Sequence, residues 1–150
     1  METFLSWITF SHICIAELSD GHYWIQDDLT IDKPVRFVGD EHNPSNVVLE
    51  MNGSITWNAK GGWCEGVTFR RPKLSGNEGT KRNLLELRGR LDVINSVFDN
   101  GGGSNGNDPV RLIGSGMKGS WRNVVVKGGK EGISAHPNAI LRKDNVCYFP

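Results

Sequence analysis

Short apolar runs separated by Gly, Asn, Asp and Pro cover the chain from Ile31 onward, and no long stretch carries a helical period of hydrophobic residues. Within each run, apolar and polar positions alternate. Such alternation is typical of a β-strand that buries one of its two faces. The pattern therefore predicts an all-β chain of many short strands.

One kind of four-residue run returns at a regular interval along the chain. Its copies open at Gly66, Asn95, Asn123 and Asn145, so the offsets are 29, 28 and 22 residues. A period of roughly 20 to 30 residues with three short strands is typical of a parallel β-solenoid, in which each coil returns the same strand about 4.8 Å above the last. The spacing therefore predicts a short parallel β-helix of four to five coils.

Two further kinds of run lie between these copies. We group the first kind as residues 47–51, 84–87, 110–113 and 132–135. We group the second kind as residues 54–57, 90–93, 118–121 and 138–141. Insertions between the runs fall at 70–83 and 100–109, where turns project outward and tolerate extra length.

The phase of the repeat predicts which side chains share a column. Phe69 and Phe98 are expected to point inward and to stack, with Val126 and Tyr148 in the coils beyond. The asparagines that open the runs tolerate a left-handed backbone, and their amides can bond from layer to layer. We therefore expect an asparagine ladder along one corner.

The two ends of the chain carry less information. Residues 1–20 depart from the repeat and are interpreted as an N-terminal capping segment, and residues 21–150 as the solenoid. The sequence stops just after a strand-like run, at Pro150, which predicts an open edge. An open edge favours self-association, a partner chain or membership in a longer chain.

Residues 29–39, which read Leu-Thr-Ile-Asp-Lys-Pro-Val-Arg-Phe-Val-Gly, resemble the first coil of right-handed parallel β-helix proteins of the pectin-lyase-like superfamily. Residues 65–69 and 94–100 are similar to the repeating third strand of that family. The resemblance is closest to non-enzymatic intracellular β-helix repeats, such as those of F-box ubiquitin-ligase subunits. It implies a scaffold or a protein-binding module.

Charge and cysteine usage narrow the class of partner and the compartment. Seventeen basic residues balance seventeen acidic ones, which argues against a nucleic-acid partner and against membrane binding. Cys14, Cys64 and Cys147 show neither disulfide-framework nor zinc-ligand spacing, so we expect free thiols and no metal or other cofactor. The first basic residue is Lys33, which disfavours a signal peptide and favours the cytoplasm, with secretion left open.

One basic concentration stands out as a candidate binding site. We expect its members to contact an acidic protein partner, with a tryptophan as aromatic anchor. The candidate residues are Arg70, Arg71, Lys73, Arg88, Arg90 and Trp57. The alternative interpretation is a solvated loop that keeps the solenoid soluble.

The rival function is that of a polysaccharide-binding or polysaccharide-cleaving protein, because pectate-lyase-type enzymes resemble this architecture. Such enzymes need clustered carboxylates on one parallel face. The candidate acids are Glu50, Glu65, Glu86, Asp92 and Asp99, and Glu50 and Glu86 are expected to stack in one ladder. We assign no catalytic residues, because outward carboxylates are equally typical of a solvated strand.

Overall fold

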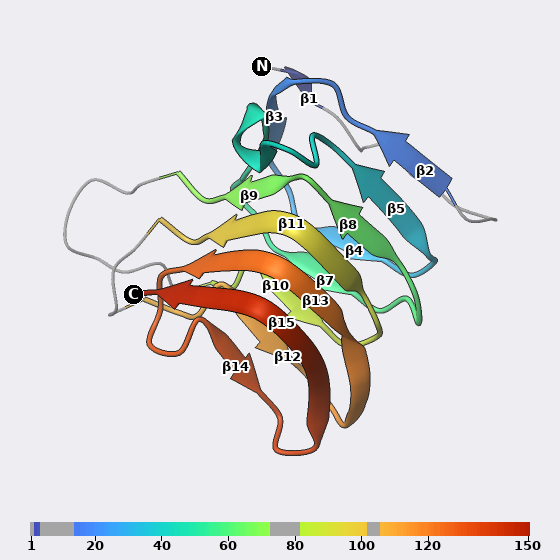
Figure 1. Cartoon of the computed structure of the whole chain (residues 1–150), viewed down its shortest axis with the longest axis vertical. Coiled ribbons are helices and arrows are strands. Elements are labelled where there is room, and N and C mark those ends of the chain that lie inside the picture. The colour runs from blue at the N-terminus through green and yellow to red at the C-terminus, as the bar shows by residue number, and fades with distance from the viewer. Residues whose placement is uncertain (1, 4–13, 73–81, 102–105) are drawn as a thin grey trace.

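A computed structural model describes residues 2–3, 14–72, 82–101 and 106–150 (Figure 1). The strands of the first half are β1 (Glu2–Thr3), β2 (Cys14–Glu17), β3 (Gly21–Ile25), β4 (Leu29–Ile31), β5 (Val35–Val38), β6 (Val47–Met51), β7 (Ile55–Trp57), β8 (Trp63–Glu65) and β9 (Thr68–Arg70). Those of the second half are β10 (Leu85–Leu87), β11 (Asp92–Asp99), β12 (Val110–Leu112), β13 (Gly116–Lys127), β14 (Ile133–Ala135) and β15 (Ala139–Phe149). A single 3-10 turn, η1 (Pro44–Asn46), precedes β6.

Every strand pair in the described part of the chain is parallel, which confirms the parallel β-solenoid. A five-stranded sheet runs in the order β14-β12-β10-β7-β4 and spans about four turns. A ten-stranded sheet forms the rest of the wall, and its longest strands, β11, β13 and β15, each bend across two faces of the coil (Figure 1). The strands at the first end of the solenoid include β1, paired with β3, and β2, paired with β5.

The bends lie at Asn95, Asn123 and Asn145, as the repeat predicts. All three are left-handed, with φ of 48°, 53° and 53°. The Asn123 amide donates to Asn95 Oδ1 at 3.2 Å, and the Asn145 amide donates to Asn123 Oδ1 at 2.8 Å. The asparagine ladder is therefore confirmed, and its amides fix the angle between the two faces.

Gly66 occupies the same corner one coil earlier, also with positive φ, at 69°. A side chain is excluded there, because a Cβ atom would lie 2.4 Å from the backbone carbon of Asp40. The backbone of the loop after β5 thus fills the space that an asparagine side chain takes in the later coils.

The core runs along the axis as columns of stacked side chains. Phe69 and Phe98 lie in register, and Phe98 is followed by Val126 and Tyr148. Trp121 stacks on Phe98 as well, with ring centroids 5.3 Å apart. No single coil could bury these rings, so burial depends on the neighbouring coils.

The grouping of the run 47–51 with 84–87 was wrong. β6 pairs with β3 and β9, whereas β10 pairs with β7, so residues 55–57 hold the position expected for 47–51. The physical reason is that every face of the coil buries an alternating apolar strand, so composition alone does not distinguish the faces. The corner that would mark the face is replaced before β6 by the loop that contains η1.

Candidate functional site

Trp57, expected as an aromatic anchor, lies in the core with 1% of its surface exposed. Its ring packs edge-on against Phe37 at 6.1 Å, and its indole N–H donates to the Gly61 carbonyl at 3.3 Å. This expectation is corrected: the side chain is inward because it occupies the buried column of β7, and it has no surface to offer a partner.

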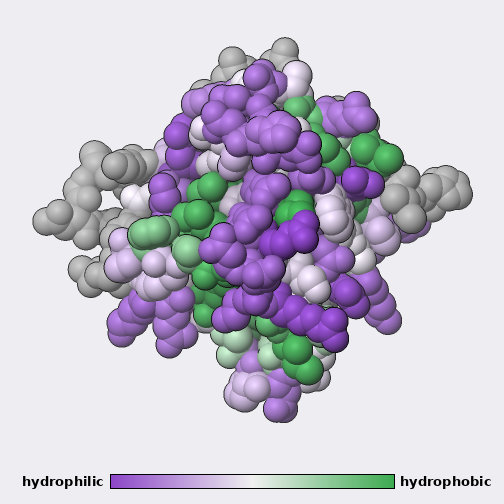
Figure 2. All heavy atoms as spheres, in the orientation of Figure 1, coloured by the Kyte–Doolittle hydropathy of each residue, from purple (hydrophilic) through white to green (hydrophobic). Residues whose placement is uncertain are grey.

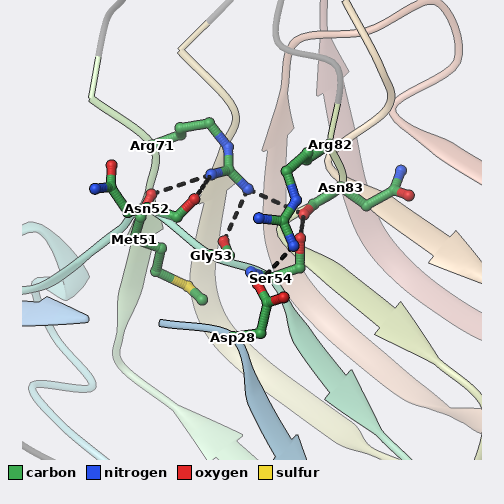
Figure 3. A network of polar contacts seen from close by, with 8 residues as sticks. All are labelled: Asp28, Met51, Asn52, Gly53, Ser54, Arg71, Arg82 and Asn83. Atoms are coloured by element: carbon green, nitrogen blue, oxygen red, sulfur yellow. Dashed lines mark hydrogen bonds and ion pairs between the residues drawn. The ribbon is translucent and has the colours of Figure 1, made fainter. Parts of the chain in front are cut away.

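Arg71, also expected to contact a partner, is 6% exposed and holds the turns together (Figure 3). Its guanidinium donates to four backbone carbonyls and one side-chain oxygen, namely Met51 O, Asn52 O, Gly53 O, Asn83 O and Asn100 Oδ1, at 2.7 to 3.2 Å. Burial lowers the pKa of this guanidinium. Arg71 is therefore a structural cation that joins turns of successive coils.

An ion pair borders this network. Asp28 accepts the backbone N–H of Ser54 at 2.9 Å and pairs with Arg82 at 2.5 Å (Figure 3). The Ser54 hydrogen bond, followed by Arg82, holds the pKa of the Asp28 carboxyl below its usual value. The turns on this side of the solenoid are consequently tied by charge as well as by backbone pairing.

The remaining basic candidates do not form one patch. Arg70, at the end of β9, pairs with Glu50, whereas Arg88 and Arg90 precede β11 and lie 4.0 Å from Glu86 and 3.8 Å from Asp92. Arg70 is in register with Asp99, the last residue of β11, whereas Arg90 precedes the first residue of that strand, so the bend at Asn95 separates the two arginines. Lys73 lies outside the described residues.

The expected carboxylate ladder is also wrong. Glu50 lies in the ten-stranded sheet between Trp24 and Arg70, and Glu86 lies in the five-stranded sheet between Thr56 and Arg111. Their separation follows from the corrected position of β6. Among the described residues, no group of three or more His, Cys, Asp or Glu side chains could hold a metal ion.

A different surface gathers residues of the kind that binding sites use. We call it the Trp63 face: the outward side chains of β5 and β8 and of the first halves of β11, β13 and β15, which lie side by side at the right of Figure 1. Its two columns are Arg36, Trp63, Asp92, Ser120 and Arg142, and Val38, Glu65, Ile94, Arg122 and Asp144. Seen as spheres, this side of the molecule is a mosaic in which small hydrophobic patches lie among hydrophilic side chains (Figure 2).

Trp63 lies on β8, the second of the five strands of this face. The Arg36 guanidinium lies 5.4 Å from the centroid of its ring, and its indole N–H donates to Glu65 Oε2 at 2.9 Å. Asp92, in the next coil, accepts the Ser120 backbone N–H at 2.8 Å. These contacts hold the two side chains in place, and a side chain that is already ordered loses little conformational entropy on binding.

Two hollows lie on either side of the Trp63 ring. One, of about 380 Å³, is lined by residues that include Trp63, Ile94, Arg122, Arg142, Lys143 and Asp144. The other, of about 560 Å³, is lined by residues that include Asp20, Arg36, Val38, Asp40, Glu41 and Glu65. The Trp63 face thus contains two grooves, and an aromatic ring lies between them.

A sequence signal for this face existed. Trp63, Asp92, Ser120 and Arg142 each lie three residues before a corner residue and repeat its offsets of 29, 28 and 22. A comparison of the residues at this position in successive repeats would have predicted that they form one column. Local concentration of charge does not show it, because each coil contributes one or two residues.

Comparison of the chain with family models, with curated proteins and with solved structures gave no match. No helix in the described ranges is both long and apolar enough to cross a membrane.

Proposed function

We propose that this chain is a non-catalytic scaffold that binds a protein partner through the Trp63 face. The observation that supports the proposal most is the half-buried Trp63 ring, held between Arg36 and Glu65 and bordered by two grooves. Trp and Arg are enriched among the residues that dominate binding energy in protein interfaces. A flat parallel sheet presents them with little loss of conformational freedom on binding.

The non-enzymatic branch of the pectin-lyase-like superfamily is the family we propose for the chain. The segment 29–39, which carries the resemblance, forms β4, a turn and β5 at the start of the solenoid. Buried Cys64 and exposed Cys147 are free thiols, which supports the reducing cytoplasm as the compartment.

Affinity capture from extracts of the protein's own source tests the function. We expect a protein partner that is enriched by the native chain, lost with Trp63→Ala and retained with Arg111→Ala. The control residue is exposed on the five-stranded sheet, away from the Trp63 face. Equal enrichment by the native chain and Trp63→Ala would contradict the proposed site.

A polysaccharide ligand is the second candidate, because an indole ring beside cationic side chains also suits a sugar ring with acidic groups. A glycan array with the native chain and Trp63→Ala distinguishes the two. Trp63-dependent glycan binding without a protein partner would favour the second function. Release of unsaturated uronate in the presence of calcium would add cleavage to it, and we expect none.

A further inference from the structure

We propose that the partner of the Trp63 face is a second copy of this chain, docked antiparallel about a twofold axis that passes near Trp63 and Ile94. The inference rests on the proposed function, since it names the protein that this face binds.

The face is electrically polar along the solenoid axis. In the groove beside β5, acidic residues outnumber the single base Arg36; they are Asp20, Asp40, Glu41 and Glu65. The groove beside β13 and β15 is lined by three bases, Arg122, Arg142 and Lys143, and by two acids, Asp92 and Asp144. From β5 to β15 the distance is about 19 Å, four strand spacings, so each groove forms one half of the face.

The charge that each side chain presents to a partner depends on the hydrogen bonds and ion pairs that it already makes within the chain. Asp92, in the basic half, is near Arg90 and accepts the Ser120 N–H, and Asp40, in the acidic half, accepts N–H groups of its own loop. Exposed Glu41 and Arg142 lie at opposite ends of the face. These ends carry opposite signs.

A twofold rotation turns this polarity into self-complementarity. In an isologous contact, a twofold axis through the middle of the face brings the acidic half of one copy opposite the basic half of the other. The same contact then forms a second time on the other side of the axis. A parallel arrangement would oppose like charges and is disfavoured. The apolar surface of Trp63 and Ile94 lies between the two halves, where the axis passes and where the strongest contacts of interfaces concentrate.

Two further features favour a copy of this chain over an unrelated protein. The formal net charge is zero, so two copies do not repel one another at long range. The face is five strands wide and its strands are short, which places the contact in the small class of interfaces, so we expect dissociation constants on the order of 10 µM.

Sedimentation equilibrium of the purified chain between 1 and 500 µM tests the proposal with two charge-reversed variants. Arg122→Glu with Arg142→Glu makes both halves acidic, and Asp20→Arg with Glu41→Arg makes both halves basic. We expect the native chain to dimerise, each variant alone to associate at least tenfold more weakly, and the mixture to form a heterodimer. Arg111→Glu, on the five-stranded sheet, should dimerise like the native chain. Circular dichroism and urea unfolding of each variant establish that the fold is intact.

Three results would overturn the inference: a native chain that is monomeric at 500 µM, a dimer that survives both reversals, or an equimolar mixture with no heterodimer. Survival of the dimer would place the contact elsewhere, such as the free edge of β15. A monomeric native chain that still captures another protein in a Trp63-dependent manner would overturn this inference and leave the proposed function standing. Loss of both would remove the proposed function as well.

Discussion

Phe69 and Phe98, which lie 29 residues apart in the sequence, stack face to face with ring centroids 5.0 Å apart and an interplanar angle of 6°. The contact exists only because β9 and β11 lie in register, with Phe98 directly above Phe69. Stacking of aromatic rings adds to the stabilisation from burial. The pair therefore reports the alignment of successive coils.

Truncation of Phe98 should be among the most destabilising changes. Its ring is 1% exposed and touches Phe69 and Trp121, so Phe98→Ala should lower the free energy of unfolding by about 3 to 5 kcal/mol. Urea denaturation at equilibrium measures the loss. Phe149→Ala, at a residue 53% exposed, is the matched control and should change stability by no more than about 0.5 kcal/mol. Equal effects would contradict the stacked core.

Two substitutions at Asn123 separate the contribution of the backbone conformation to stability from that of the side-chain amide. Asn123→Gly keeps the left-handed backbone and loses the amide bonds to Asn95 and Asn145, so we expect a loss of about 1 kcal/mol. Asn123→Ala adds the left-handed strain, for a total of about 2 to 3 kcal/mol. Chemical denaturation of both variants gives the order, and a more stable alanine variant would argue against the left-handed corner.

Arg71 should behave as a folding residue and not as a binding residue. Arg71→Met leaves the carbonyls of Asn52, Gly53 and Asn83 without their guanidinium donor, which should cost about 3 to 5 kcal/mol. Arg82→Met removes a half-exposed pair with Asp28 and should cost at most about 1 kcal/mol. Thermal and urea unfolding test both. Comparable losses of unfolding free energy in the two variants would show that the Arg71 hydrogen bonds do not hold the turns together.

The two described thiols should differ sharply in reactivity. Cys64 is buried, and burial raises the pKa of its thiol to about 12, whereas Cys147 is exposed. In a Cys14→Ser background at pH 8, we expect a disulfide reagent to modify one thiol per folded chain, and none after Cys147→Ser until urea is added. Rapid reaction of Cys64 in the folded protein would contradict its place in the core.

Asp40 should contribute to stability in a pH-dependent way. Hydrogen bonds from the Asn46 amide and from the backbone N–H groups of Asn43 and His42 hold the pKa of its carboxyl below the ordinary value of 3.8. A carboxyl whose pKa is lower when folded stabilises the fold above its unfolded pKa, and the contribution disappears as pH falls through the folded pKa. Asp40→Asn should therefore lower the Tm at pH 7, and the difference should shrink below pH about 4.

The control for that experiment is Asp27→Asn, at another exposed carboxylate, which we expect to leave the Tm of the native chain unchanged at each pH. Scanning calorimetry at pH 7, 5 and 3 gives the comparison. A constant difference between Asp40→Asn and the native chain across this range would show that the loop does not depend on the charge of Asp40.

Much of the fold could be predicted because the corner residues carry a backbone requirement. Gly66, Asn95, Asn123 and Asn145 mark one position in successive coils, and the columns of Phe69 and Phe98 follow from it by alternation. Where no such corner exists, before β6, the same alternation is compatible with more than one face. The misplacement of 47–51 has that cause.

The candidate binding surface was harder to predict for a related reason. Arg70 and Arg90 belong to one basic concentration in the sequence, but Arg70 is in register with the last residue of β11 and Arg90 precedes its first residue. Trp57 resembles an exposed anchor only until its column is known to face inward. Residues that share a surface on a solenoid are one coil apart, as Trp63 and Asp92 are. Charge counted over a short window therefore samples different faces.

The stacking of successive coils in register is the claim on which the Trp63 face and its proposed partner depend. A two-dimensional NOE spectrum of the chain with protonated Phe, Trp and Val in a deuterated background measures it directly. We predict cross-peaks between the rings of Phe69 and Phe98 and between those of Phe98 and Trp121. Absence of both, with contacts from Phe98 to residues outside these columns, would contradict the account.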